Sequence, residues 1–508
     1  MSPAHEPTAD DTFLIDLDAQ SLRSRTIRGS LVTAVVQVSK MILQLGSTVI
    51  LGRLLFPADF GLVAMVYPII GFVQLFGNLG FGEAIVQRRT ISRADVSALF
   101  WLNLAIGGAL AIVGAGLSPL AAWVYGDGRV VLLMSAVAAL LPLSALSSTP
   151  IAILSRQMRF GTIARNDLAA TFVGITATVV VALLGWSYWS LVFGQFVSTA
   201  TSNVLTWFSV RWLPSRPALT GNFWNDVKFG TNITGANIAT FITSSGDNVI
   251  IGAFNGKTAL GIYDRSYRLV VQPLGQMLAP ISTVALPHLS RLQDQPDAYR
   301  SAYLDFVRVI LLLTVPMMIL CTLNAHFLVF LLLGPHWTAA AKTFSWISVG
   351  GLLSGFYSSL TWLFISQAKT ALMRRYMSIA AVFNIVSFLI GTIWGVEGVA
   401  ACAAIVFILV SVPMVTYGAT LSGPVGLRDI VACALPYVIA GLAAAALAIG
   451  LRRLLAGNNY AVVLASCCAI YGCYLVMALV RPREREMIVF SLAQIRSRLR
   501  PISNVAQD

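Results

Sequence analysis

Residues 46–67 read GSTVILGRLLFPADFGLVAMVY, and residues 246–267 read GDNVIIGAFNGKTALGIYDRSY. The two stretches align without a gap at an offset of 200 positions. The identical pairs are Gly46/Gly246, Val49/Val249, Ile50/Ile250, Gly52/Gly252, Gly61/Gly261 and Tyr67/Tyr267. Chance similarity between apolar segments explains shared valine and isoleucine, but it does not explain glycine and tyrosine in the same register. The stretches therefore indicate an internal repeat, and we expect the chain to contain two related halves.

The composition predicts that both halves lie in a membrane. Of the 508 residues, 57% are hydrophobic and 11% are charged, whereas a soluble domain usually has about a quarter charged residues. Apolar runs follow one another from about residue 29 to about residue 481. Since one membrane crossing needs about 20 apolar residues, the sequence predicts an all-α polytopic membrane protein with about 14 transmembrane helices. A soluble multidomain enzyme is excluded.

The repeat also predicts how the spans are grouped. An even number of spans separates the two copies, so both copies cross the membrane in the same direction. We therefore expect two parallel six-helix lobes, related by an axis along the membrane normal, and two additional C-terminal helices. The expected parts are a cytoplasmic N-tail (1–28), an N-lobe (29–212), a cytoplasmic linker (213–225), a C-lobe (226–420), two further spans (421–481) and a cytoplasmic C-tail (482–508) with an interfacial helix.

The distribution of basic residues predicts the orientation of the chain. Lysine and arginine are enriched on the cytoplasmic side of membrane proteins. If the N-terminus is cytoplasmic, 25 of the 34 basic residues lie in cytoplasmic segments and 8 lie on the other side. This bias predicts a multi-pass protein with both termini in the cytoplasm.

Two polar stripes run along the first span (29–52) and the seventh span (226–252). At 100° per residue, the polar residues of the first span fall within an arc of about 80°. Polar side chains in a span normally face protein or water, so we expect both stripes to line a shared substrate cavity. The alternative is that they form hydrogen bonds between helices within each lobe. The stripes consist of Thr33, Gln37, Lys40, Gln44 and Ser47, and of Asn237, Thr240, Ser244 and Asp247.

Two stripe residues carry a charge. Lys40 lies about 11 residues, or roughly 16 Å, into its span, where a charge is costly and indicates function by default. We expect Lys40 to face the cavity, and the alternative is a buried ion pair with Asp247. Asp247 is the candidate for ion coupling, because a carboxylate in a span can exchange a proton or a cation.

Three arginines lie near the predicted outer ends of the spans, namely Arg53, Arg265 and Arg268. An arginine offers paired donors to a phosphate group, so these residues are candidate phosphate contacts at the outer mouth of the cavity. Ordinary contacts with lipids or loops are the equal alternative.

Other kinds of site are not indicated. The six cysteines lie in apolar stretches without Cys-x-x-Cys spacing, and the four histidines are scattered. The segment 252–258 reads GAFNGKT, and its glycines are one residue too close for a phosphate-binding loop. We therefore expect no metal, no cofactor, no catalytic residue and no nucleotide hydrolysis. The net charge of +13 is dispersed, which does not indicate a nucleic-acid partner.

Four segments carry a resemblance to a known family: residues 51–66, residues 78–88 (NLGFGEAIVQR), residues 156–160 (RQMRF) and residues 261–267 (GIYDRSY). They resemble the bacterial polysaccharide exporters of the colanic-acid type, in the multidrug/oligosaccharidyl-lipid/polysaccharide exporter superfamily. The resemblance covers roughly residues 29–420. It implies a V-shaped pair of lobes that moves an undecaprenyl-diphosphate-linked oligosaccharide across the bacterial inner membrane by alternating access. It also implies cationic cavity residues for the diphosphate, and Lys40 and Arg53 are the positions suited to this role.

The resemblance implies three kinds of partner: the lipid-linked oligosaccharide, membrane lipids and the polysaccharide polymerase machinery. Two alternative functions remain. A multidrug antiporter of the same superfamily needs deep carboxylates, but the first six spans offer only Glu83. A membrane polymerase or ligase needs a large outer loop with catalytic groups, whereas the longest outer loop here has about 16 residues.

Overall fold

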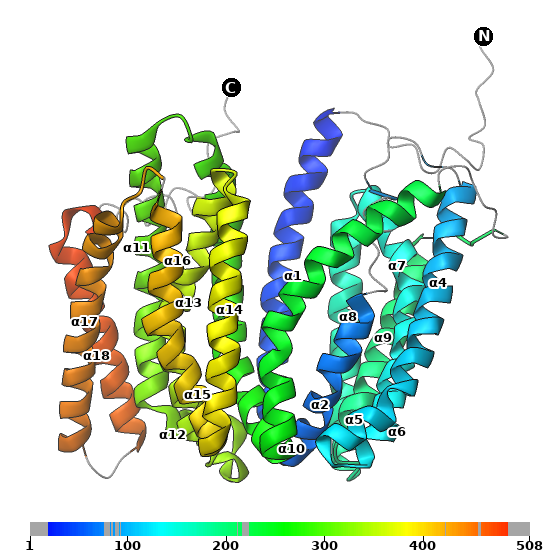
Figure 1. Ribbon diagram of the computed structural model, residues 1–508, viewed down its shortest axis with the longest axis horizontal. Helices are drawn as coiled ribbons and strands as arrows, with labels where there is room; N and C mark the ends of the chain where they lie inside the picture. Colours follow the sequence, from blue (N-terminus) through cyan, green and yellow to red (C-terminus); the bar gives the residue numbers. More distant parts are fainter. Residues whose placement is uncertain are drawn as a thin grey trace, which may run out of the picture. The chain divides into compact units, whose positions relative to one another are not determined.

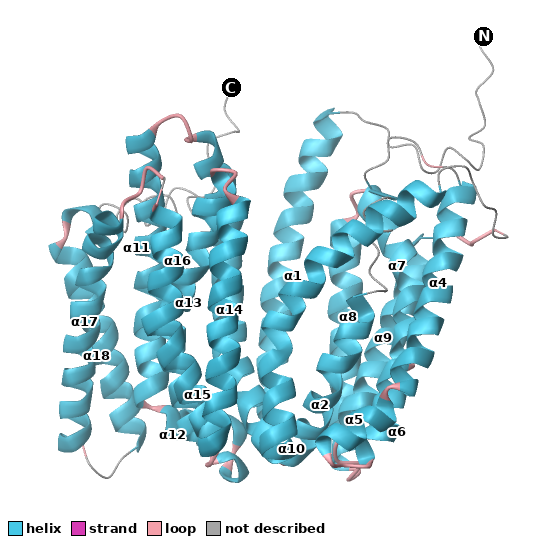
Figure 2. Cartoon of the chain, in the orientation of Figure 1, coloured by secondary structure: helices cyan, strands magenta, loops and turns pink. Residues whose placement is uncertain are grey.

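The computed structural model describes residues 19–75, 82, 85–86, 91, 93–210, 212–215, 223–421, 423–455 and 459–485. Side chains are described in these ranges except at residues 19–34, 223–244 and 459. The described part consists of helices and their connections and contains no strand (Figure 2). The prediction of an all-α protein is therefore confirmed.

Eleven stretches of the described chain are long and apolar enough to cross a membrane. Two of them, Ser245–Arg291 and Thr370–Thr420, have 47 and 51 residues, which exceeds twice the length of about 20 residues that one crossing needs. The membrane character expected from the composition is thus confirmed. The number of about 14 crossings stays a prediction.

The described chain divides into two compact units. Unit 1 contains the residues up to Arg265 together with Phe330–Thr338, and unit 2 contains Ser266–Val329 and the residues from Ala339 onward. These bounds differ from those of the predicted lobes, because the first part of α10 and the segment from the last turn of α12 to Thr338 belong to unit 1. The predicted lobes, linker and tails stay predictions, and residues 1–18, 216–222 and 486–508 lie outside the described residues.

Unit 1 is a bundle in which α8 packs on α9 and on α1, and α4 packs on α7 (Figure 1). The contact between α8 and α9 is close because small residues face each other, as is common in membranes. A Cβ atom on Gly194 would lie 1.7 Å from Oγ1 of Thr178. The helices are α1 (Ala19–Leu54), α2 (Pro57–Leu75), α4 (Arg93–Gly116), α5 (Ser118–Tyr125), α6 (Arg129–Ala138), α7 (Leu140–Arg156), α8 (Phe160–Leu183), α9 (Trp189–Val210) and the first part of α10 (Phe223–Arg291).

Unit 2 is a second bundle, in which α11 packs on α13 and α17, and α17 packs on α18. Buried hydroxyl groups join α11 to α13, with 2.6 Å between Tyr299 and Ser366 and 3.1 Å between Tyr303 and Ser359. The helices are the last part of α10, from Ser266, α11 (Pro296–Leu323), the first part of α12 (Ala325–Leu333), α13 (Ala340–Ser366), α14 (Thr370–Gly391), α15 (Gly395–Val406), α16 (Val412–Thr420), α17 (Leu427–Leu454) and α18 (Asn459–Val480). The short helical turns η3 (Thr392–Trp394) and η4 (Phe407–Ser411) also belong to unit 2, whereas η2 (Pro335–Trp337) belongs to unit 1.

Helix α10 corrects one expectation. The sequence predicts two spans, 226–252 and 268–290, joined by a loop. In the structure, helical residues continue through this region, and only Gly256 departs from helical geometry, with φ 79° and ψ 178°. Glycine takes such a positive φ without a steric penalty, so a single residue changes the direction of the chain. Arg265 and Arg268 therefore lie on a helix and not in a loop.

Candidate functional site

The described half of the predicted cavity lies on α1. Gln37 is exposed, and Lys40 and Gln44 are half-buried. Asn237, Thr240 and Ser244 belong to α10, but their side chains lie outside the described residues, as do the Thr33 side chain and Glu83. Two polar stripes facing a common cavity therefore stay a prediction.

Lys40 forms an ion pair that the sequence did not predict. Its Nζ lies 2.6 Å from Oδ2 of Asp167 on α8, and the side chains are 25% and 51% exposed. The alternative of an ion pair between Lys40 and Asp247 is wrong. Asp167 follows the first residue of α8 by seven positions, or about 10 Å along the helix. Lys40 thus pairs with α8 about two turns into that helix, and its side chain is partly exposed.

Asp247 is buried, with 9% of its surface exposed. Its Oδ1 accepts a hydrogen bond of 2.8 Å from the backbone N–H of Asn248, and the Tyr263 side chain also hydrogen-bonds to it. Asp264 is close enough for the two carboxylates to repel each other. Two acidic groups therefore share one buried region at the second copy of the repeat.

The three candidate outer-mouth arginines have different surroundings. Arg53 donates from Nη2 to the backbone oxygen of Leu331 at 2.9 Å. Arg265 lies 3.3 Å from the Asp264 carboxylate, and its guanidinium carbon stands 4.1 Å above the ring of Phe60. Arg268 is exposed but belongs to unit 2. Arg265 is thus held by a carboxylate and an aromatic ring. The phosphate role of the three residues stays a prediction.

The two copies of the repeat make matching contacts inside unit 1. A Cβ atom on Gly52 would lie 2.7 Å from Cδ2 of Leu333, and a Cβ atom on Gly252 would lie 2.9 Å from Cε1 of Tyr125. Leu333 and Tyr125 are each followed by a glycine with positive φ, at 93° and 66°. Each repeat glycine therefore contacts the end of a helix that lies just before a glycine turn.

An ion pair lies beside these contacts. Lys257 Nζ is 2.8 Å from Oδ2 of Asp127, and Arg129 Nη2 is 2.7 Å from the same oxygen. The side chains of Lys257 and Asp127 are 31% and 15% exposed. Because Asp127 receives two cations, its charge links α10 to the turn between α5 and α6.

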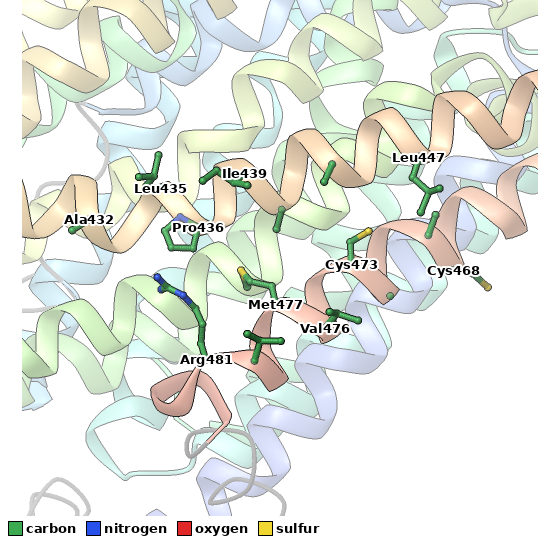
Figure 3. Close-up of a pocket in the computed structure, with 15 residues that line it drawn as sticks. Ala432, Leu435, Pro436, Ile439, Leu447, Cys468, Cys473, Val476, Met477 and Arg481 are labelled. Carbon is green, nitrogen blue, oxygen red and sulfur yellow. The ribbon is translucent and has the colours of Figure 1, made fainter.

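An apolar groove runs between α17 and α18 in unit 2 (Figure 3). Its volume is about 900 Å³. Leu435, Ile439 and Val476 are typical of its lining, and Arg481 at one end is its charged residue. The Arg481 guanidinium donates to Glu484 at 3.2 Å. The groove has the chemistry of a site for a hydrocarbon chain with a cation beside one end.

Known proteins similar to this chain act in polysaccharide biosynthesis. The Escherichia coli (strain K12) lipopolysaccharide biosynthesis protein WzxC is 22% identical over 363 residues, covering 70% of this chain and 73% of its own. The Rhizobium meliloti (strain 1021) succinoglycan biosynthesis transport protein ExoT is 26% identical over 291 residues, covering 57% of this chain and 59% of its own.

Solved structures show the same fold. The lipid II flippase MurJ in an inward closed conformation matches with a TM-score of 0.70 and 16% identity, covering 91% of this chain and all of its own. An inward-facing multidrug resistance transporter of the MATE family matches with a TM-score of 0.58 and 14% identity, covering 76% of this chain and 97% of its own. The family described as polysaccharide biosynthesis protein matches residues 50–342. Because this match spans more than half of its length, the chain belongs to the polysaccharide biosynthesis protein family.

Proposed function

We propose that the protein is a flippase that moves an undecaprenyl-diphosphate-linked oligosaccharide across the bacterial inner membrane by alternating access. The observation that carries the proposal is family membership in a chain with eleven candidate membrane spans among its described residues. One relative is named as a succinoglycan biosynthesis transport protein, and a lipid II flippase has the same fold. These similarities support a cargo in which a sugar is linked to a lipid.

Lys40 is the residue that we assign to the diphosphate. Its side chain is 25% exposed, and its ammonium group pairs with the half-exposed Asp167. A diphosphate carries more negative charge than one carboxylate, so it can compete with Asp167 for the ammonium group. In this account the ion pair holds Lys40 in place while the cavity is empty, and the cargo replaces Asp167 when it enters. The polar residues Gln37, Gln44, Asn237, Thr240 and Ser244 then meet the sugars.

The groove between α17 and α18 is suited to the isoprenoid chain. Apart from Arg481, its lining consists of aliphatic, cysteine, methionine, glycine and proline residues. An apolar groove in the membrane lets the chain move with its headgroup without entering the polar cavity. In this arrangement Arg481, at one end of the groove, lies near the charged headgroups of the membrane lipids.

Ion coupling and partners complete the proposal. Asp247, buried beside Asp264, is the proposed coupling carboxylate, because the binding of a proton or a cation relieves the repulsion between the two acids. The distribution of basic residues supports cytoplasmic termini. The polysaccharide polymerase machinery is the proposed partner that uses the flipped cargo.

Deletion of the gene tests the function. We expect the deletion strain to lose its surface polysaccharide and to accumulate the lipid-linked oligosaccharide in the inner membrane, and we expect the wild-type gene to restore both. Extracted lipids are quantified by mass spectrometry. Normal polysaccharide in the deletion strain, without accumulation of the lipid intermediate, contradicts the proposal.

A multidrug antiporter is the second candidate, and the fold shared with a MATE transporter favours it. The charged residue of the α1 stripe is a lysine, which repels cationic drugs and attracts anions. The deletion strain distinguishes the two functions, because an antiporter predicts increased sensitivity to cationic drugs with unchanged polysaccharide. A flippase predicts the reverse.

A further inference from the structure

A polar pocket lies in unit 1, where α8 begins and α9 ends. Its volume is about 730 Å³. Arg159, Arg165 and Asn166 contribute its polar side, and Leu205 and Phe208 contribute its apolar side. The Phe208 ring is 79% exposed, as expected for a side chain that faces lipid. The pocket therefore joins two guanidinium groups to a surface that contacts hydrocarbon.

Hydrogen bonds connect the two helices that form the pocket, but the N–H donors of one arginine stay available. Arg159 donates from Nη1 to the backbone oxygen of Ser209 at 2.9 Å, and the Asn166 amide donates to the Ser209 hydroxyl at 3.0 Å. Asn166 is 5% exposed, so these bonds fix α8 against α9. Arg165 is exposed, and among the described residues no hydrogen bond or ion pair holds its guanidinium. Its five N–H groups remain available to an anion.

The local charge of the pocket is positive. Asp167 follows Arg165 by two positions, and residues two apart on a helix do not face each other. Asp167 instead pairs with Lys40 on α1. Helix α8 begins at Phe160, and no side chain caps this end, where the helix dipole also favours an anion. The carboxylate of Asp167 therefore does not neutralise the two arginines.

The same turn occurs twice in the chain at an offset of 210 positions. Gln157 and Arg159 of the first turn correspond to Gln367 and Lys369 of the second, and Arg165 corresponds to Arg375. The residues between them, Met158 and Ala368, have φ angles of 54° and 55°. The positive-inside rule explains basic residues on one side of the membrane, but it does not explain basic residues at the same positions of the same turn.

We propose that the pocket between α8 and α9 binds the phosphate group of a membrane lipid. Arg159 and Arg165 donate to the phosphate oxygens, a geometry for which the planar guanidinium is well suited. Leu205 and Phe208 contact the hydrocarbon chain. The phosphate belongs either to a bulk phospholipid or to an isoprenoid diphosphate, which offers the same chemistry. The site does not depend on the proposed transport function, because any phosphate-bearing lipid of the surrounding membrane can fill it.

Native mass spectrometry of the purified full-length protein tests this site. Four probes are titrated separately: dioleoyl phosphatidylglycerol, undecaprenyl diphosphate, inorganic phosphate and a glucosyl diacylglycerol that lacks phosphate. Loss of a charged hydrogen-bonding partner weakens binding roughly tenfold or more, so we expect Arg165→Gln to reduce the affinity for a phosphate-bearing lipid by this factor. Arg428→Gln is the matched control, because Arg428 is an exposed arginine outside the pocket. We expect it to bind like the wild type.

The probes identify the source of the phosphate. If Arg165→Gln weakens the binding of phosphatidylglycerol, the site binds bulk phospholipid. If Arg165→Gln weakens the binding of undecaprenyl diphosphate alone, the site binds an isoprenoid lipid. Either result supports the site. Arg165-dependent binding of inorganic phosphate without either lipid overturns the lipid assignment. Equal binding of every probe by wild type and Arg165→Gln, with unchanged melting temperatures, overturns the site itself.

Discussion

Gly61 on α2 and Gly261 on α10 lie so close together that neither position has room for a side chain. A Cβ atom on Gly61 would lie 1.7 Å from the backbone oxygen of Lys257, and one on Gly261 would lie 1.9 Å from the backbone oxygen of Pro57. Pro57 and Lys257 are also 200 positions apart. Each copy of the repeat therefore contacts the same point of the other copy, as an approximate two-fold axis requires.

This contact predicts the effect of alanine at the two glycines. We expect Gly61→Ala and Gly261→Ala to destabilise the protein by about 1–3 kcal/mol, because the new methyl group overlaps a backbone oxygen that cannot move without shifting a helix. The measurement is the melting temperature of the purified protein. Gly46 and Gly246 are a matched control pair, since no heavy atom lies within 4 Å of a Cβ atom built there. Equal melting temperatures for all four variants would show that α2 and α10 are not in close contact.

The ion pair of Lys257 and Asp127 predicts a measurable coupling between two substitutions. Because both side chains are partly exposed, we expect a double-mutant cycle of Lys257→Met and Asp127→Asn to give a coupling energy of about 0.2–1 kcal/mol. Asp127→Asn alone should be the more destabilising single change, since it also removes the partner of Arg129. Thermal unfolding of the four proteins provides the values. Strictly additive effects would contradict the ion pair.

The sequence predicted the helical membrane fold and the family, and the structure and the comparisons confirm these two predictions. Gly61 and Gly261 were recognisable as matched positions, but a repeat does not reveal which residues touch. The partner of Lys40 was not predicted, because Asp167 lies 127 positions away in the sequence. The apolar pattern also suggested a loop around Gly256. The backbone geometry of the structure shows instead that Gly256 alone changes the direction of the helical chain.

Exchange of the charges of Lys40 and Asp167 separates a cargo role from a structural role. We expect Lys40→Ala to abolish polysaccharide export, because the diphosphate loses its cation. The double variant Lys40→Asp, Asp167→Lys restores an ion pair but moves the cation to α8, so we expect export to remain absent while membrane abundance is normal. Export is measured by complementation of the deletion strain. If the double variant recovers export, Lys40 is needed only for its ion pair with Asp167 and not for binding the cargo.

Asp247 predicts the response of transport to an ion gradient. Asp247→Asn retains the shape of the side chain but removes its charge, so we expect transport by reconstituted protein to lose its dependence on an imposed pH or sodium gradient. Asp305→Asn is the control, because Asp305 is a half-exposed carboxylate paired with Arg308 in unit 2. If Asp247→Asn keeps the gradient response of the wild type, Asp247 is not the coupling residue and its role is structural.

A flipping assay in reconstituted vesicles measures whether the protein moves the lipid-linked cargo across a bilayer. The purified protein is incorporated into vesicles that carry a radiolabelled undecaprenyl-diphosphate oligosaccharide on the inner leaflet only, and an impermeant glycosidase outside releases the label from cargo that has crossed. We predict release that depends on the protein and is lost in Lys40→Ala. If vesicles with folded and correctly inserted protein release label only at the rate of protein-free vesicles, the protein is not a flippase for this cargo.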